Sequence, residues 1–230
     1  MTIKRIGVLG AGMLGGGAGI AHLTAMKGFE VVLYCVEQRF VEGAIKRISG
    51  YLDRKIENRK MTVEEKEAVL KRITITTKME DLASVDLVIE AIFEDIETKK
   101  CAFEKLDKIC GPDIIFGSNS SAALINALAS VTSRPDKVVG LRFVNPALIM
   151  RKVEVIRGYY TSEETMKLAT EVIQAMGKTT VVPFVKAIHN AEKGVHTPED
   201  VDILVSLGLS CLIRPFQHLD YSAVDISLQA

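Results

Sequence analysis

Residues 7–22 read GVLGAGMLGGGAGIAH and hold seven glycines. The apolar run before them predicts a β-strand, and the segment after them predicts a helix that leads to a second strand at 30–35. Gly10, Gly12 and Gly15 follow the first strand in GxGxxG spacing. In this setting the glycines permit a tight turn, a close approach to a pyrophosphate and close packing of helix on strand. The stretch predicts a dinucleotide-binding loop, with a ligand-free turn as the alternative.

Apolar, β-branched runs alternate with helical patterns along residues 3–184. The runs that predict strands are 3–10, 30–37, 72–77, 85–92, 113–119, 137–143, 152–158 and 179–184. Such strands, separated by helices, predict an α/β fold of the Rossmann type, with a doubly wound, mostly parallel sheet covered on both faces.

Helix boundaries are marked by local signals. Thr62 with Glu65 and Thr161 with Glu164 match the capping-box pattern, and Gly177 fits a left-handed helix stop. Beyond about residue 184 the pattern becomes helical only. We therefore expect a dinucleotide-binding domain over 1–184 and a short all-helical C-terminal domain over 185–230.

Composition narrows the class of protein. The 29 basic and 29 acidic residues cancel, so no global field attracts nucleic acid or an anionic membrane. The four cysteines lack metal-ligand spacing and are typical of free thiols in a reducing compartment. No apolar run has the length of a membrane span, and the first residues do not resemble a signal peptide. We expect a cytoplasmic protein without a metal.

Four later stretches belong together. They are VIEAIFEDIETKK (88–100), FGSNSSAALI (116–125), RPDKVVGLRFVNP (134–146) and KVEVIRG (152–158). With the glycine loop they resemble the L-3-hydroxyacyl-CoA dehydrogenase family, including its 3-hydroxybutyryl-CoA members. The resemblance runs from residue 3 to about 182 and resumes at 192–209 and 214–221. It implies oxidation of the 3-hydroxyl of an acyl-CoA thioester, NAD as cofactor, and a homodimer formed through the helical domain.

The resemblance also implies roles for single residues. Glu94 and Lys99 match positions that contact NAD, and Ser121 matches a serine that hydrogen-bonds the substrate. Asn145 matches an asparagine beside the nicotinamide, and Glu154 matches the carboxylate that orients the catalytic histidine.

The catalytic histidine itself is replaced. The family pattern is G-(L/M)-H-F-x-N-P, whereas residues 140–146 read GLRFVNP and place Arg142 at the position of the base. Arginine stays protonated and offers no acceptor lone pair, so Arg142 cannot remove a proton. It can polarise a carbonyl oxygen as an electrostatic donor, or it can form an ion pair with Glu154 inside the protein.

Two further departures concern the cofactor and the tail. Cys35 stands where an acid is expected to bind the adenosine ribose. Glu37 is a substitute that favours NAD, while Arg39 leaves NADP as an alternative. The family's PGF-x-x-NR helix, whose asparagine completes the active site, has no counterpart after VVPF (181–184).

Basic residues gather in the predicted helix after the second strand. Arg47, Arg54 and Lys55 share one helical face, and Arg59 and Lys60 follow it. We expect Arg54 and Lys60 to bind the phosphates of coenzyme A, with a solvated charged face as the alternative. The four histidines, at 22, 189, 196 and 218, are expected to have surface or packing roles.

Two main functions remain open. The first is an NAD-dependent 3-hydroxyacyl-CoA dehydrogenase impaired by the loss of its histidine. The second is an inactive homologue that binds the dinucleotide or acyl-CoA as a sensor or partner. A third interpretation is that the sequence comes from this family and has been altered at its functional positions.

Overall fold

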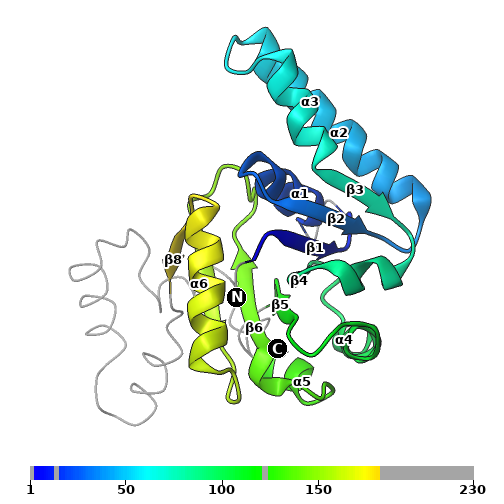
Figure 1. Ribbon diagram of the computed structural model, residues 1–230, viewed down its shortest axis with the longest axis vertical. Helices are drawn as coiled ribbons and strands as arrows, with labels where there is room; N and C mark the ends of the chain where they lie inside the picture. Colours follow the sequence, from blue (N-terminus) through cyan, green and yellow to red (C-terminus); the bar gives the residue numbers. More distant parts are fainter. Residues whose placement is uncertain (1–2, 13–15, 121–123, 182–230) are drawn as a thin grey trace, which may run out of the picture. The chain divides into compact units, whose positions relative to one another are not determined.

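The computed structural model describes residues 3–12, 16–120 and 124–181, and the structural statements below concern these residues. Its strands form one sheet in the order β3-β2-β1-β4-β5-β6-β7-β8 (Figure 1). The strands are β1 (Arg5–Leu9), β2 (Glu30–Tyr34), β3 (Ile73–Thr76), β4 (Leu87–Glu90), β5 (Ile115–Ser118), β6 (Val138–Phe143), β7 (Lys152–Arg157) and β8 (Thr179–Val181). Each lies within one of the runs predicted from the sequence.

Strand directions confirm the expected fold class. All neighbours from β3 to β6 pair in parallel. Only β7 runs against its neighbour β6, and β8 pairs in parallel with β7. The sheet is therefore mostly parallel and of the Rossmann type.

Helices cover both faces of the sheet. One face packs against α1 (Gly17–Met26), α2 (Gln38–Glu57), α3 (Val63–Lys71) and α6 (Glu163–Ala175). The other packs against α4 (Ile96–Ile109), α5 (Ile125–Ala129) and the 3-10 helix η1 (Met79–Ser84). A second 3-10 helix, η3 (Pro135–Lys137), precedes β6. Helices α2 and α3 lie side by side and extend beyond the β3 edge of the sheet (Figure 1).

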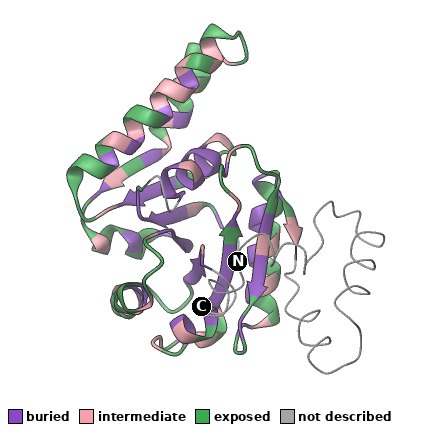
Figure 2. Ribbon diagram, turned by 180° about the vertical axis from the view of Figure 1, so that it is seen from behind, coloured by how far each residue is buried: buried purple, intermediate pink, exposed green. Residues whose placement is uncertain are grey.

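The strands are apolar throughout because both faces are buried. Along β2, Val31 and Leu33 pack with α1, whereas Val32 and Tyr34 belong to the core on the α4 face. Figure 2 shows the central strands buried and the outer α2–α3 surface largely exposed. This double coverage accounts for the near-continuous hydrophobic runs of the sequence.

The first predicted capping box is present at the start of α3. Glu65 N donates to Thr62 Oγ1 at 3.2 Å, and Thr62 N donates to Glu65 Oε2 at 2.8 Å. Gly177 follows α6 with φ of 73°, which confirms the predicted left-handed stop.

The second predicted capping box, Thr161 with Glu164, is wrong. Ser162 caps α6 instead, because its side chain accepts from Thr165 N at 3.1 Å. The hydroxyl of Thr161 is already engaged, since it donates to Val138 O at 2.6 Å and accepts from the backbone of residue 158 at 2.8 Å.

The first compact unit of the chain ends at Val181. The expected boundary near 184 and the helical segment 185–230 lie outside the described residues. Within the described part, no helix has the length and apolarity needed to cross a bilayer.

Candidate active site

The strand order reverses between β1 and β4, and the carboxyl ends of such a pair form the crevice where dinucleotides bind. Gly10 follows β1 at this point with φ of 111°. A Cβ on Gly10 would lie 2.7 Å from the carbonyl oxygen of Ala91, which follows β4. The first glycine of the predicted loop is therefore required by both its backbone conformation and its close neighbour.

Gly12 and Gly17 differ in the space around them. A Cβ on Gly12 would meet no described atom within 4 Å, so the backbone there stays open to a ligand. A Cβ on Gly17, the first residue of α1, would lie 1.9 Å from Gly10 O. Gly17 therefore permits close packing of helix on strand, while Gly15, for which this role was predicted, lies outside the described residues.

The predicted ribose position lies at the end of β2. Gly10 N donates to Tyr34 O at 2.8 Å, which places the half-buried Cys35 beside the glycine loop. Glu37 is the N-cap residue of α2, and its Oε2 lies 2.6 Å from Arg39 Nε. The two predicted discriminating residues, Glu37 and Arg39, are thus paired with each other.

A buried charged pair lies behind the crevice. Glu90, the last residue of β4, is fully buried, and its Oε1 accepts from Lys99 Nζ at 2.7 Å. Its Oε2 accepts from Ser118 Oγ at 2.6 Å. Lys99 Nζ also lies 3.2 Å from Oε2 of Glu94, whose side chain is exposed. The predicted NAD contacts Glu94 and Lys99 are therefore brought together.

Sequence reasoning missed Glu90 and Ser118. A signal was present, because Lys99 shares the apolar stripe of α4 with Ala102, Phe103 and Leu106, and a lysine at such a position needs a buried partner. The acidic residue that ends the apolar strand LVIE is that partner.

The predicted substrate serine, Ser121, lies outside the described residues. Its neighbour Ser120 is buried, and Ser120 Oγ lies 3.4 Å from Glu94 Oε2. Asn119 Oδ1 accepts from Phe143 N at 2.7 Å, which ties the loop after β5 to the end of β6.

Arg142 and Glu154 are directly opposite residues of β6 and β7. Arg142 Nη1 lies 3.2 Å from Glu154 Oε2, so the predicted ion pair is present. The expectation that Arg142 is buried is wrong, because 44% of its side chain is exposed. Arg142 is the next-to-last residue of β6, so its side chain stands near the end of the strand, after a run of four buried residues.

Asn145 follows β6 and approaches the glycine loop. A Cβ on Gly16 would lie 2.6 Å from Asn145 Oδ1. The segment that carries Arg142 and Asn145 is therefore next to the start of α1. This contact brings the predicted cofactor loop and the predicted catalytic segment to one place.

The predicted coenzyme A residues lie on the α2–α3 extension. Arg54 is exposed in the last turn of α2, where its Nε donates to Gly50 O at 3.3 Å. Lys60 is exposed in the turn before α3. Arg47, nearer the sheet, instead donates from Nη2 to Ala11 O in the glycine loop at 3.2 Å.

Comparison with known proteins decides the family. The family model "3-hydroxyacyl-CoA dehydrogenase, NAD binding domain" matches residues 5–186. The chain belongs to the 3-hydroxyacyl-CoA dehydrogenase family. A Bacillus subtilis protein named "Probable 3-hydroxybutyryl-CoA dehydrogenase" is 38% identical over 99% of this chain and 84% of its own length.

Relatives in other organisms agree. The mitochondrial hydroxyacyl-coenzyme A dehydrogenase of Homo sapiens is 34% identical over 98% of this chain and 78% of its own. The crystal structure of (S)-3-hydroxybutyryl-CoA dehydrogenase PaaH1 from Ralstonia eutropha matches with a TM-score of 0.77 and 31% identity, over 99% of this chain and 85% of that one.

NAD is the cofactor of this 3-hydroxyacyl-CoA dehydrogenase fold. The described residues fit a dinucleotide, because Gly12 leaves open space beside the start of α1 while Gly10 and Gly17 close the turn below it. Backbone N–H groups at a helix start are suited to a pyrophosphate. Gly10 and Gly12 follow β1, Glu37 precedes α2 and Glu94 follows β4, whereas Lys99 is buried on α4 with Glu90.

His22 has a packing role, as expected. It is buried on α1, its ring meets the ring of Tyr51 edge-on at 5.1 Å, and its Nε2 has no hydrogen-bond partner among the described residues. Burial, with a contribution from the Lys55 ammonium, lowers the pKa of His22 to about 4.

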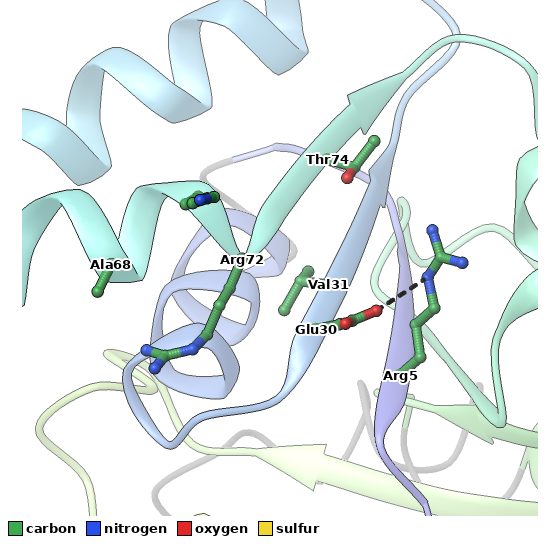
Figure 3. Close-up of a pocket in the computed structure, with 7 residues that line it drawn as sticks. Arg5, Glu30, Val31, Ala68, Arg72 and Thr74 are labelled. Atoms are coloured by element: carbon green, nitrogen blue, oxygen red, sulfur yellow. Dashed lines mark ion pairs between the residues drawn. The ribbon is translucent and has the colours of Figure 1, made fainter.

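A hollow of about 480 Å³ lies at the opposite, amino edge of the sheet (Figure 3). Two of its three cations have partners within the protein, since Arg5 pairs with Glu30 at 3.8 Å and Arg72 Nη1 donates to Ala25 O at 3.4 Å. None of the predicted site residues lines it, so the candidate site is the crevice at the carboxyl edge.

Proposed function

We propose that the protein interconverts 3-hydroxyacyl-CoA and 3-oxoacyl-CoA with NAD, at a rate reduced by the loss of the catalytic histidine. The substrate class follows from relatives named 3-hydroxybutyryl-CoA dehydrogenases. The observation that carries the proposal is the contact of Gly16 with Asn145, because it joins the cofactor loop to the segment of Arg142.

In the oxidative direction the substrate hydroxyl must lose its proton. A histidine held by a carboxylate suits this step because its pKa is near neutral. Arg142 cannot accept the proton, and Glu154 is engaged with Arg142. When bound, NAD supplies the acceptor for the hydride that leaves C3 of the substrate. We expect oxidation to be slower by ~10²–10⁴-fold than with a general base.

In the reductive direction Arg142 retains a role. Its guanidinium donates to the 3-oxo oxygen and stabilises the negative charge that develops there. Water then delivers the proton that completes the hydroxyl. Ser121 and Asn145 orient the substrate, and Arg54 and Lys60 hold the coenzyme A phosphates. We expect a cytoplasmic homodimer.

The second candidate function is binding of the dinucleotide or acyl-CoA without turnover. The observation that favours it is the arginine at position 142, where the family has its catalytic histidine. Two measurements separate the candidates: a titration with NADH, and the decay of NADH absorbance with acetoacetyl-CoA. Binding with turnover above a no-enzyme control supports the dehydrogenase. Binding without turnover supports the second candidate, and no binding of NADH contradicts the dehydrogenase and the dinucleotide-binding form of the second candidate. Free acetoacetate is the control, because it lacks coenzyme A.

A further inference from the structure

We propose that this protein discriminates poorly between NAD(H) and NADP(H), through Cys35 and Arg39. The inference rests on the cofactor site described above and concerns its preference at the adenosine ribose. In Rossmann folds an acidic residue after the second strand binds the ribose diol and repels a 2′-phosphate, whereas a nearby arginine accepts that phosphate.

Cys35 removes the repulsive element. It directly follows β2 beside the glycine loop, because Tyr34 O accepts from Gly10 N at 2.8 Å. The thiol is half-buried, and its backbone N donates to Thr76 O at 3.2 Å. A thiol is a weak hydrogen-bond donor, so it forms a poor contact with the diol. It also presents no carboxylate to a 2′-phosphate.

Arg39 supplies the attractive element. It lies in the first turn of α2, which contains no acidic residue, and 73% of its side chain is exposed. Its Cζ lies 4.9 Å from the ring centroid of Phe40, so the guanidinium is supported near the helix start. Arginine presents several N–H donors in a fork that suits phosphate oxygens.

Glu37 is the residue that would preserve a preference for NAD over NADP, yet Arg39 compensates its negative charge. Its Oε2 lies 2.6 Å from Arg39 Nε, and 47% of its side chain is exposed. An exposed ion pair of this kind is weak. Arg39 can therefore leave Glu37 and bind a 2′-phosphate with little loss of free energy. Diol and phosphate therefore meet a neutral pair rather than a net negative charge.

The test compares the dissociation constants of NADH and NADPH, measured from nicotinamide fluorescence in the full chain. The protein has no tryptophan, which keeps its own emission low. We expect the Kd for NADPH to be less than tenfold above that for NADH. A ratio of tenfold or more overturns the inference. Failure of both cofactors to bind overturns the dinucleotide site as well, so the two outcomes are distinguishable.

Matched variants identify the residues responsible. Cys35→Asp should raise the NADPH:NADH ratio of dissociation constants at least tenfold, whereas Cys35→Ala, which adds neither a charge nor a hydrogen-bonding group, should leave it unchanged. Arg39→Ala should raise the ratio at least threefold by weakening NADPH. Arg157→Ala breaks a similar exposed pair, with Glu163 at 2.6 Å, at the opposite edge of the sheet and should have no effect. Equal ratios in wild type, Cys35→Asp and Arg39→Ala would overturn the assignment.

Discussion

Arg142 of β6 and Glu154 of β7 face each other across an antiparallel pair of strands, with Arg142 Nη1 3.2 Å from Glu154 Oε2. The position of the carboxylate is the one that the family resemblance implies for holding an imidazole. Because the pair is solvent-exposed, it contributes at most about 1 kcal/mol to the free energy of unfolding. The residue at 142 can therefore be exchanged without loss of the fold.

The glycine loop gives a matched pair of variants. Gly12→Val should leave the melting temperature without ligand nearly unchanged, because no described atom lies within 4 Å of the new Cβ. It should abolish the rise in melting temperature that NAD causes by binding the native state. Gly17→Ala should instead lower the free energy of unfolding by roughly 2 kcal/mol or more, since its Cβ would clash with Gly10 O at 1.9 Å.

Thermal melts of the three proteins, with and without NAD, check this prediction. A normal shift with NAD in Gly12→Val would mean that the glycines form a turn without a phosphate. Wild-type stability of Gly17→Ala would contradict the close approach of α1 to β1.

The buried Glu90–Lys99 pair should be important for stability. Glu90→Gln leaves the Lys99 ammonium with only the exposed Glu94, so the free energy of unfolding should fall by about 3 kcal/mol. Glu97→Gln is the control, because Glu97 forms an exposed pair with Lys100 at 3.0 Å on the same helix. The control should change the same free energy by about 0.5 kcal/mol or less. Denaturant unfolding measures both, and equal losses would argue against a buried pair.

His22 should make stability depend on pH. Its folded pKa of about 4 lies below the unfolded value of 6.5, so the unfolded state binds more protons between these values. The contribution is complete above pH 6.5 and is lost as pH falls toward 4. Between pH 7.5 and pH 5 the loss is about 2 kcal/mol.

His22→Phe retains an aromatic ring against Tyr51 and removes the titrating group. The variant should lose about 2 kcal/mol less than wild type over the same pH interval, measured by denaturant unfolding. Parallel pH profiles in the two proteins would show that His22 does not titrate between the folded and unfolded states.

The fold was predictable because each strand is a short apolar run and both faces of the sheet are covered. The loop was predictable only in part. The close approach of Gly17 to Gly10 O was not predicted, because Gly17 lies two residues beyond the GxGxxG spacing, which ends at Gly15. The Glu90–Lys99 pair depends on β4 and α4 folding back on each other, which composition does not show. Arg142 was expected to be buried, since the sequence does not show that the end of β6 is left partly exposed.

The central claim is that Arg142 occupies the place of the catalytic base. Arg142→His rebuilds a carboxylate–histidine pair, because Glu154 raises the pKa of the imidazole and orients it. Arg142→Ala removes the cation without supplying a base, and Arg142→His with Glu154→Gln removes the orienting partner. The unmatched PGF-x-x-NR segment and Cys35 should keep even the best variant below the rate of its relatives.

The most direct measurement is the initial rate of NADH formation from 3-hydroxybutyryl-CoA by these proteins at saturating NAD. Arg142→His should be faster than wild type by at least ~10-fold, a fraction of the usual contribution of a general base. Arg142→Ala should gain nothing, and Arg142→His with Glu154→Gln should lose most of the gain. A wild-type rate equal to that of Arg142→His would contradict the account, because another group would then be removing the proton.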